Sequence, residues 1–391
     1  MIRQKSHSDQ SVLEAALDRI RYIYSIFDNV VVSFSGGKDS TCALNLTIKV
    51  AEELGRLPVQ VVFYDWEVIH PPTVEYVLRI KQNPKIKLDI YCLPIKHRNA
   101  CSNEEPWWYS WNPNEKSLWV RDMPEGAITE HPSFKFGMSF QDFSDWTCGP
   151  SEGMVARITG VRTQESFTRL KAVSRKVNEN YIAASVGHGN TKNCHPIYDW
   201  SSEDVWNLVR DWGLDYNRTY DIFNRTKFYN KLLSQRVSPP FGEEPMRSLW
   251  LYSECFPEMW HKMLKRVKGV SVAWRYSNTE IFGFGKIQKP DATSWQSYSA
   301  IVVEQYTGKD KEKVTDCIEM LIRRHKAKTD DEIPEESPHP LTGMSWRFLV
   351  KNILRGDFKK RAPAALESLA IAAQKKLGIK SYKEAKRIYG N

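Results

Sequence analysis

The sequence has no hydrophobic run that approaches the roughly 20 apolar residues needed to cross a bilayer. Its first residues, Met1-Ile2-Arg3-Gln4-Lys5, are polar and contain no apolar signal segment. Cysteine is scarce as well, since the chain has 7 cysteines and no two of them form a Cys-Cys or Cys-x-x-Cys pair. We therefore expect a cytoplasmic protein with reduced thiols and no membrane partner.

Acidic residues are few near the C-terminus. Residues 351–391 contain 11 Lys and Arg against 3 Asp and Glu, a difference of +8, while the whole chain of 391 residues has a formal net charge of +9. This concentration of positive charge predicts a polyanionic partner, nucleic acid first of all, bound by a basic tail at residues 339–391. The alternative is a solvated helical face. The sequence also leaves open the possibility of a protein partner.

The most informative stretch lies near the N-terminus. A strand pattern at residues 30–34 runs directly into Ser35-Gly36-Gly37-Lys38-Asp39-Ser40, and the apolar spacing that follows predicts a helix. Unpaired backbone N–H groups and the positive end of the helix converge at such a turn, where a phosphate binds. The glycines allow close approach, and Lys38 adds a point charge. The turn is not a Walker A loop, because Val32 stands at the first glycine position and Asp39 follows the lysine.

Strands and helices alternate along the first part of the chain. After a helix that begins beyond Ser11, strand patterns at residues 30–34, 59–64 and 86–93 are separated by helical patterns. This order predicts an α/β fold with a parallel sheet. Ligands bind at the carboxyl ends of the strands in such sheets, and both the glycine turn and Asp65 fall there.

A second motif, Gly160-Val161-Arg162-x-x-Glu165-Ser166-x-x-Arg169, follows a strand pattern at residues 155–161. Planar guanidinium groups suit phosphate or sulfate oxygens, and the spacing of Arg162 and Arg169 places them on one face of a helix. Glu165 would hold one of these arginines in place or bind Mg²⁺. The alternative is a surface helix with a Glu165–Arg169 ion pair.

These motifs resemble those of known families. The glycine turn resembles the PP-loop of ATP pyrophosphatases in the adenine nucleotide alpha-hydrolase superfamily. Residues 160–169 and the Pro-Ile-x-x-Trp and Asp-Val-Trp segments within residues 196–206 are similar to motifs of the 3′-phosphoadenosine 5′-phosphosulfate (PAPS) reductase family. Trp119-Val120-Arg121-x-Met123-Pro124 and the C-terminal extension look like the immunoglobulin-binding regulator A-like branch of that family.

The resemblance implies a Rossmann-like domain, with a mainly helical C-terminal extension, that binds ATP and cleaves it between the α- and β-phosphates. It implies catalytic roles for Lys38, Asp39, Arg162 and Glu165, with Mg²⁺ held by Asp39. The nucleotide-binding residues that it implies are Ser35, Gly36, Gly37, Lys38, Asp39, Ser40, Asp65, Gly160, Arg162 and Arg169.

Three functions stay open. The first is an ATP pyrophosphatase that adenylates or thiolates a substrate, with nucleic acid as the expected acceptor. The second is a sulfonucleotide enzyme, either a PAPS reductase or an ATP sulfurylase small subunit, and the third is a nucleotide-gated regulator. We favour the first. Reductases of the family carry a cysteine in a Glu-Cys-Gly-Leu-His-like tail, and this chain has none after Cys317. They also generally lose the intact Gly-Gly-Lys-Asp pattern, because PAPS has no β,γ-pyrophosphate to be held.

The chain divides into three expected parts. We expect a PP-loop domain at residues 1–215, an α-rich domain at 216–330 and the basic tail, with an acidic, proline-bearing linker at 329–338. In the C-terminal half the sequence predicts one strand, at residues 302–306. The helices that it predicts there are at residues 219–237, 246–268, 312–328, 363–377 and 381–389.

Regular periodicity is lost in an insertion at residues 99–151, which is rich in tryptophan. Its aromatic residues would form a lid, a base-stacking surface or a small core of their own. Cys148, Cys194 and Cys255 stand in loop-like settings, where they would bind a metal, accept sulfur or lie buried as small hydrophobic residues.

Overall fold

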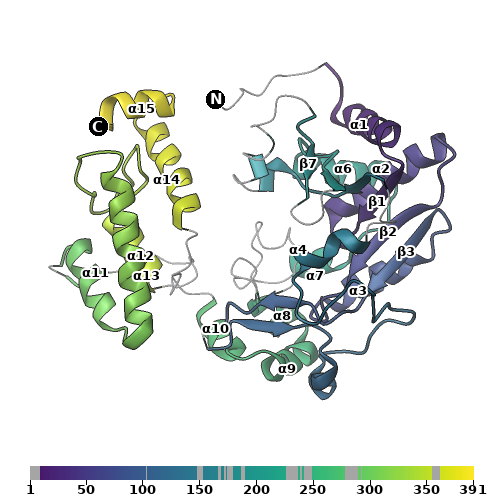
Figure 1. Ribbon diagram of the computed structural model, residues 1–391, viewed down its shortest axis with the longest axis horizontal. Coiled ribbons are helices and arrows are strands. Elements are labelled where there is room, and N and C mark those ends of the chain that lie inside the picture. Colours follow the sequence, from purple (N-terminus) through teal and green to yellow (C-terminus); the bar gives the residue numbers. More distant parts are fainter. Residues whose placement is uncertain are drawn as a thin grey trace. The chain divides into compact units, whose positions relative to one another are not determined.

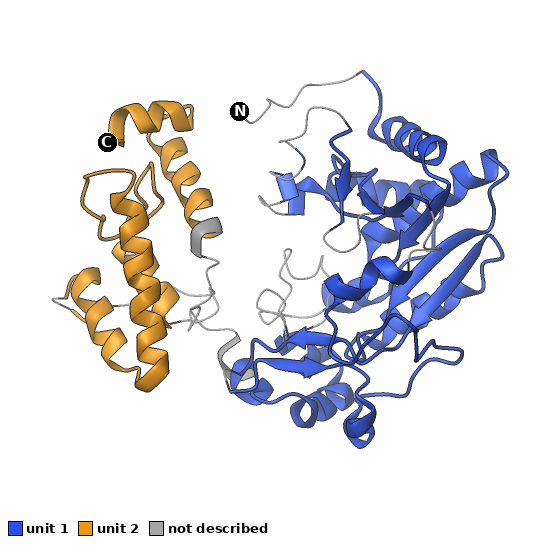
Figure 2. Ribbon diagram, viewed as in Figure 1, with its two compact units in different colours: residues 1–277 blue, residues 278–391 orange. Residues whose placement is uncertain are grey.

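The computed structural model describes residues 9–102, 104–147, 153–165, 169–170, 173, 179–185, 190–225, 237, 240–241, 249–277, 289–291, 293–354 and 362–391. The chain forms two compact units, residues 1–277 and residues 278–391, which we call unit 1 and unit 2 (Figure 2). Unit 1 therefore includes the first helices of the α-rich region. The three-part division expected from the sequence stays a prediction.

Unit 1 is built on a six-stranded sheet, and Figure 1 labels four of its strands, β1, β2, β3 and β7. The strand order is β3-β2-β1-β6-β8-β7. All neighbouring strands are parallel except β7 and β8, which are antiparallel. The strands are β1 (Asn29–Ser33), β2 (Val59–Tyr64), β3 (Ile86–Tyr91), β6 (Val155–Ile158), β7 (Ile182–Ala184) and β8 (Thr191–Cys194). The expected α/β fold with a parallel, Rossmann-like sheet is confirmed, while β7 and β8 were not predicted.

Helices cover one face of the sheet. Along β1, Val30 and Val32 pack with these helices, whereas Val31 between them points to the opposite face. This alternation is the period of two that a strand imposes on its side chains. The helices on this face are α1 (Val12–Ile26), α2 (Lys38–Glu53), α3 (Pro71–Lys81) and α6 (Ser202–Asp211). A capping box between Ser11 and Glu14 begins α1, as its sequence predicts.

The insertion covers the opposite face. Phe143 is fully buried there, and Phe134 and Phe140 pack beside it against Tyr64 and Tyr91 of the sheet. This part of the insertion therefore joins the core of the sheet and does not form the small core of its own that was one of the expected alternatives. Its short elements are β4 (Lys96–Arg98), β5 (Trp107–Tyr109), α4 (Phe140–Phe143) and the 3-10 helices η1 (Pro113–Leu118) and η2 (Ser144–Thr147).

Four further helices follow in the described residues of unit 1. The expected helix at residues 246–268 is two helices, α8 (Leu249–Cys255) and α9 (Pro257–Arg266), because Pro257 starts a new helix. The expected helix at 219–237 is α7 (Thr219–Asn224) in its described part, and residues 226–236 lie outside the described residues. The last helix is α10 (Val270–Ser277).

Unit 2 is helical in its described residues. Its helices are α11 (Trp295–Glu304), α12 (Gly308–Lys326), α13 (Trp346–Leu354), α14 (Ala362–Lys376) and α15 (Tyr382–Tyr389). The predicted helices at 312–328, 363–377 and 381–389 are confirmed in α12, α14 and α15. No described helix of either unit is both long and apolar enough to cross a membrane.

Two expectations for unit 2 are wrong. The predicted strand at 302–306 falls largely within α11, where Ser294 caps the helix and Val302 packs on Val314 and Ile353. The short apolar run has neither a helical nor a strand period, so the N-cap and the packing of Val302 determine that it is helical. The expected linker at 329–338 is part of the folded unit, because Trp346 N donates a hydrogen bond to Pro334 O and the Glu335 side chain accepts one from Trp295 N.

Candidate nucleotide site

The glycine turn lies between β1 and α2 and is held by its own side chains. Ser40 Oγ donates to Gly37 O at 2.9 Å and accepts a hydrogen bond from Ser35 N at 3.2 Å. Gly37 is the residue before α2 and has no side-chain cap, so the first N–H groups of the helix face the turn. Gly36 has a φ of +71°, and a Cβ there would lie 2.9 Å from Thr73 Cγ2. The turn therefore requires glycine at this position.

The second motif lies against the first through Gly160. A Cβ on Gly160 would approach Asp39 C and Ser40 N to 2.6 Å, which leaves no room for any side chain. β6, which precedes Gly160, pairs with β1, and β1 pairs on its other side with β2. The chain connection reverses direction here, which makes this point the topological switch where ligands bind in open α/β sheets.

Asp39 lies between two cations. Its Oδ2 is 2.8 Å from Lys38 Nζ, and its Oδ1 is 2.5 Å from Arg162 Nε. Both cations are almost completely buried, whereas Asp39 is partly exposed. Arg162 also donates to Trp200 O and to Ser202 Oγ at the start of α6. The turn and the second motif thus form one charged cluster at the ends of β1 and β6.

Glu165 and Arg169 form an ion pair with each other, and Glu165 Oε1 lies 3.8 Å from Arg162 Nε. Glu165 ends the 3-10 helix η3 (Thr163–Glu165), and Arg169 is more exposed than Arg162. Residues 166–168 of the motif lie outside the described residues. The predicted sharing of one helix face by the two arginines therefore stays a prediction, while the alternative ion pair between Glu165 and Arg169 is present.

Three residues that sequence reasoning missed complete the wall of the glycine turn. Asn217 Nδ2 donates to Gly36 O at 2.9 Å and to Thr73 Oγ1 at 2.8 Å. The Tyr220 hydroxyl accepts a hydrogen bond from Lys38 N at 3.1 Å. Burial raises the pKa of Tyr220, so the group at this helix end is a neutral hydroxyl. No sequence signal connects residues 217 and 220 with a turn about 180 residues earlier.

Asp65 lies at the carboxyl end of β2, as predicted, but it is completely buried. Its Oδ1 accepts hydrogen bonds from Glu67 N and from Arg121, which is in the expected branch motif. The Trp111 indole N–H donates to Asp65 O at 2.6 Å. Burial, together with the charge of Asp65, raises the pKa of the nearby Cys92 thiol. Asp65 therefore contacts the insertion, and its predicted role in nucleotide binding stays a prediction.

A buried ion pair ties the insertion and α9 to the end of β2. Arg266 Nε and Nη2 contact the two carboxylate oxygens of Glu67 at 2.7 and 3.0 Å. Glu67 also accepts hydrogen bonds from Trp111 N and Val120 N, and Arg266 donates to Tyr109 O at 2.5 Å. Burial opposes the charge of Arg266, but the hydrogen bonds and charges of Glu67 and Glu115 outweigh it and raise the pKa. Six polar groups of distant segments thus meet at one point.

The cysteines do not form a metal site within the described residues, where no group of three His, Cys, Asp or Glu side chains is arranged to hold a metal. Cys194 is buried on β8, and burial raises the pKa of the Cys255 thiol at the end of α8 to about 11. Cys148 lies outside the described residues. For the described cysteines, burial as small hydrophobic residues fits best.

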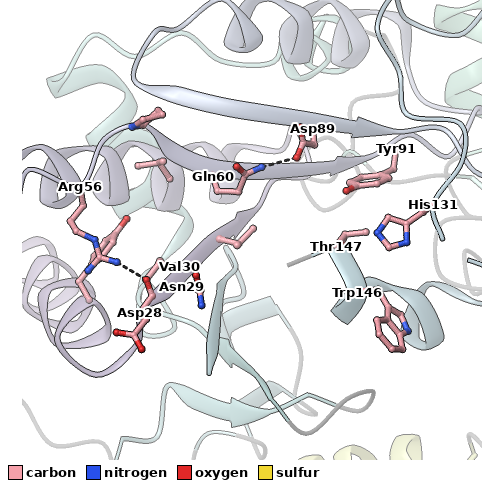
Figure 3. Close-up of a pocket in the computed structure, with 14 residues that line it drawn as sticks. Asp28, Asn29, Val30, Arg56, Gln60, Asp89, Tyr91, His131, Trp146 and Thr147 are labelled. Atoms are coloured by element: carbon pink, nitrogen blue, oxygen red, sulfur yellow. Dashed lines mark hydrogen bonds between the residues drawn. The ribbon is translucent and has the colours of Figure 1, made fainter. Parts of the chain in front are cut away.

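A cavity of about 480 Å³ lies away from the glycine turn (Figure 3). Its lining includes Asn29 and Gln60 near the starts of β1 and β2, whereas the turn follows the end of β1. Asp28, Arg56, Asp89 and His131 are among the charged or titratable groups drawn around it, and Gln60 donates a hydrogen bond to Asp89 at 2.7 Å. None of the predicted site residues lines this cavity.

The family of the chain is defined by its first half. The model of the family described as the phosphoadenosine phosphosulfate reductase domain matches residues 29–225, which is half of the chain. The chain belongs to this family. A second family, described as a domain of unknown function (DUF3440), matches residues 230–351. The more specific regulator branch stays a prediction.

Two curated relatives illustrate the range of similarity. The protein YbdN of Escherichia coli K12 is 29% identical over 372 residues, and the match covers 90% of each chain. An adenosine 5′-phosphosulfate reductase of Staphylococcus epidermidis is 24% identical over 210 residues, covering 53% of this chain and 72% of the reductase.

Solved structures resemble the chain more remotely. The ATP complex of Candida glabrata FMN adenylyltransferase is 11% identical with a TM-score of 0.34, covering 56% of this chain and 63% of that enzyme, less than two thirds of its length. A Candida auris PAPS reductase is 14% identical with a TM-score of 0.30, covering 56% of this chain and 94% of the reductase. Structural similarity this remote does not support a conclusion about function.

Proposed function

We propose that the protein binds ATP at the glycine turn and cleaves it to AMP and pyrophosphate, activating a substrate as an adenylate or for thiolation. The observation that carries this proposal is the cluster of Lys38, Asp39 and Arg162 at the switch point of the sheet, beside a turn that requires glycine at position 36. Two cations and the start of a helix at one point favour a polyphosphate.

ATP binding requires the cluster to change partners. In the structure Lys38 and Arg162 are both engaged by Asp39, and Lys38 N is engaged by Tyr220. Phosphate oxygens would take over the hydrogen bonds of Lys38 and of this backbone N–H. Arg162 is held from behind by Trp200 O and Ser202 Oγ, so it would stay in position beside the phosphates.

Mg²⁺ fits this site in one respect. Mg²⁺ bound with ATP usually takes one or two protein carboxylates and completes its shell with phosphates and water. Asp39 is the carboxylate beside the turn, and both of its oxygens are in ion pairs with Lys38 and Arg162. Asp39 would hold Mg²⁺ once phosphates draw Lys38 away. The ion would neutralise charge on the departing pyrophosphate.

We expect turnover to release AMP and pyrophosphate rather than ADP and phosphate. Thin-layer analysis of ATP labelled at the α-phosphate measures this directly, with and without a mixture of oligonucleotides as acceptor. Arg162→Met should abolish AMP formation, since the cation beside the phosphates is lost, while Arg169→Met, which removes an exposed cation of the same motif, should reduce it far less. ADP as the only product would contradict the proposal. Sulfite released from PAPS would instead favour the sulfonucleotide alternative.

The proposed acceptor is nucleic acid, and the exposed cations of unit 2 support this. On α15, Lys383, Lys386 and Arg387 are all exposed. The terminal Asn391 N donates to Lys328 O at 3.3 Å, so the end of α15 lies beside the last turn of α12. That turn adds further cations, among which Arg323, Arg324 and Lys326 are exposed. The two helix ends together make a basic surface suited to phosphates.

Charge reversal tests this surface better than removal of the tail. Leu366 of α14 packs with Leu321 and Met344, so a truncation would open the core of unit 2. For the triple variant Lys383→Glu, Lys386→Glu and Arg387→Glu we expect weaker binding of duplex DNA. We also expect the dependence of log K on log salt to become shallower, by about 0.9 for each DNA phosphate that the variant no longer neutralises.

Filter binding at several salt concentrations measures both quantities. The matched control reverses three cations at the opposite end of α12, Lys309, Lys311 and Lys313. Equal affinity and slope in the α15 variant and the unmodified protein would remove the basic tail from the proposal.

A further inference from the structure

We propose that an exposed aromatic and cationic face of the insertion binds single-stranded nucleic acid by stacking on its bases. We call this face the aromatic platform; its exposed residues are Trp107, Lys135 and Phe136, and the half-buried Lys96, Arg98 and Tyr109 complete it. It belongs to unit 1 and shares no residue with the basic surface of unit 2. Its role as the place where an acceptor binds rests on the proposed function, whereas its binding of nucleic acid does not.

The register of the β4–β5 hairpin creates this platform. Lys96 is paired with Tyr109 and Arg98 with Trp107, while His97 and Trp108 form the pair between them. Because side chains alternate along a strand, the first two pairs share one face and the middle pair points to the other. Trp108 and its partner His97 stack at 4.9 Å, and Trp108 is only 6% exposed. Trp107 on the platform is 47% exposed.

A neighbouring segment extends the platform. Lys96 N donates to Met138 O at 3.0 Å, which draws residues 135–139 alongside β4. Phe136 then stacks on Tyr109 with ring centroids 5.0 Å apart and an angle of 25° between the rings, and it is 55% exposed. Phe136 is therefore held at the surface by its stacking on Tyr109, and Trp107 by the pairing of its strand with β4.

The cations of the platform lie beside its aromatic rings. Lys96 Nζ is 4.5 Å from the centre of the Trp107 ring, and Arg98 Cζ is 5.6 Å from it. Lys135 beside Phe136 is exposed. Aromatic rings that stack with bases, alternating with cations that contact phosphates, are the combination used to bind single strands without sequence preference. A duplex offers phosphates but hides the faces of its bases.

The carboxylates near the platform already have partners. Asp142 is close enough to Lys96 to feel its charge, but its carboxylate accepts hydrogen bonds from Ser139 N and Oγ, which lower its pKa together with that charge. Glu104 and Glu105 at the far end of the hairpin form ion pairs with Lys268 at 3.0 and 3.2 Å. The platform itself includes three cations and no carboxylate, so it presents positive charge to a strand.

Substitution of the rings tests the proposal in the full chain. We expect Trp107→Ala and Phe136→Ala each to weaken binding of a fluorescently labelled oligothymidylate about tenfold, as loss of one stacked base predicts. Trp107→Phe should retain most of the affinity, because it keeps a ring. Leu118→Ala is the matched control, since Leu118 is an exposed apolar residue of the same insertion, 39% exposed, without a ring.

Fluorescence anisotropy without ATP measures this binding, and it is repeated in the chain that carries the three α15 substitutions. ATP affinity, measured by calorimetry, should be the same in all of these variants, which separates the platform from the nucleotide site. Unchanged oligothymidylate affinity in Trp107→Ala and Phe136→Ala would overturn the proposal. So would loss of a co-purifying protein in these variants with oligothymidylate binding intact, which would assign the platform to a protein partner.

Discussion

Lys38→Ala is expected to weaken ATP binding more than tenfold. A charge-assisted hydrogen bond contributes about 1.5–3 kcal/mol, and each 1.4 kcal/mol corresponds to roughly a factor of ten in affinity. Lys38 is 2% exposed and is the only cation within the glycine turn itself. Its loss also leaves Asp39 with Arg162 as its remaining ion-pair partner, so the carboxylate charge near the phosphates is less well compensated.

Isothermal titration calorimetry at constant salt measures this effect. Lys49→Ala is the matched control, because Lys49 is on the same helix, half-exposed, and paired with Glu53 at the surface. Lys38→Met is the second variant, since it keeps most of the buried side-chain volume and separates loss of charge from loss of packing. An affinity for ATP that is equal in Lys38→Met and the unmodified protein would remove the glycine turn from the proposed site.

Arg266→Ala is expected to destabilise unit 1 by about 3–5 kcal/mol, the usual cost of breaking a buried ion pair by removing one partner. Glu67 would remain as a completely buried carboxylate that keeps hydrogen bonds only from Trp111 N and Val120 N. Tyr109 O would also lose its donor. Since these groups lie in β5, on either side of η1 and in the residues after β2, the insertion should detach from the end of the sheet.

Urea denaturation gives the loss of stability, and hydrogen exchange gives its location. We expect faster exchange in residues 107–120 and in α9, with little change in unit 2. Lys265→Ala is the control, because Lys265 is the exposed residue next to Arg266 on the same helix. The double variant Glu67→Gln with Arg266→Met should be less destabilised than the sum of its single changes. Stability of Arg266→Ala within about 0.5 kcal/mol of the unmodified protein would show that the pair contributes little.

Much of unit 1 was predictable because its signals are local. The apolar runs at β1, β2 and β3, the capping boxes of α1 and α6, and the glycines between β1 and α2 act within a few residues. The same reasoning failed for α11, where the apolar run at residues 301–303 carries no period of its own. It failed again at residues 329–338, where acidic residues and prolines suggested a linker but hydrogen bonds to α11 and α13 hold the segment in the fold.

The predicted site residues also divide into those whose neighbours follow from local motifs and those whose neighbours depend on distant segments. The structure brings together the glycine turn, Gly160 and Arg162, which come from two motifs, and pairs Glu165 with Arg169 at their edge. It places Asp65 under the insertion, paired with Arg121. The prediction that Asp65 lies at the end of a strand was correct. Which neighbours its side chain meets depends on the insertion, and nothing in the local sequence describes how that insertion folds.

The sequence by itself determined the turn, its glycines and its charged residues, since backbone conformation at Gly36 and the start of α2 are properties of a few adjacent residues. Only the tertiary structure decided what faces the turn. Asn217 and Tyr220 contact it from α7 and the residues before it, and Arg266 anchors α9 to Glu67 at the next strand. These contacts join residues about 180 to 200 positions apart. They form because the ends of parallel strands gather distant connections at one edge of the sheet, an effect of topology that no periodicity records.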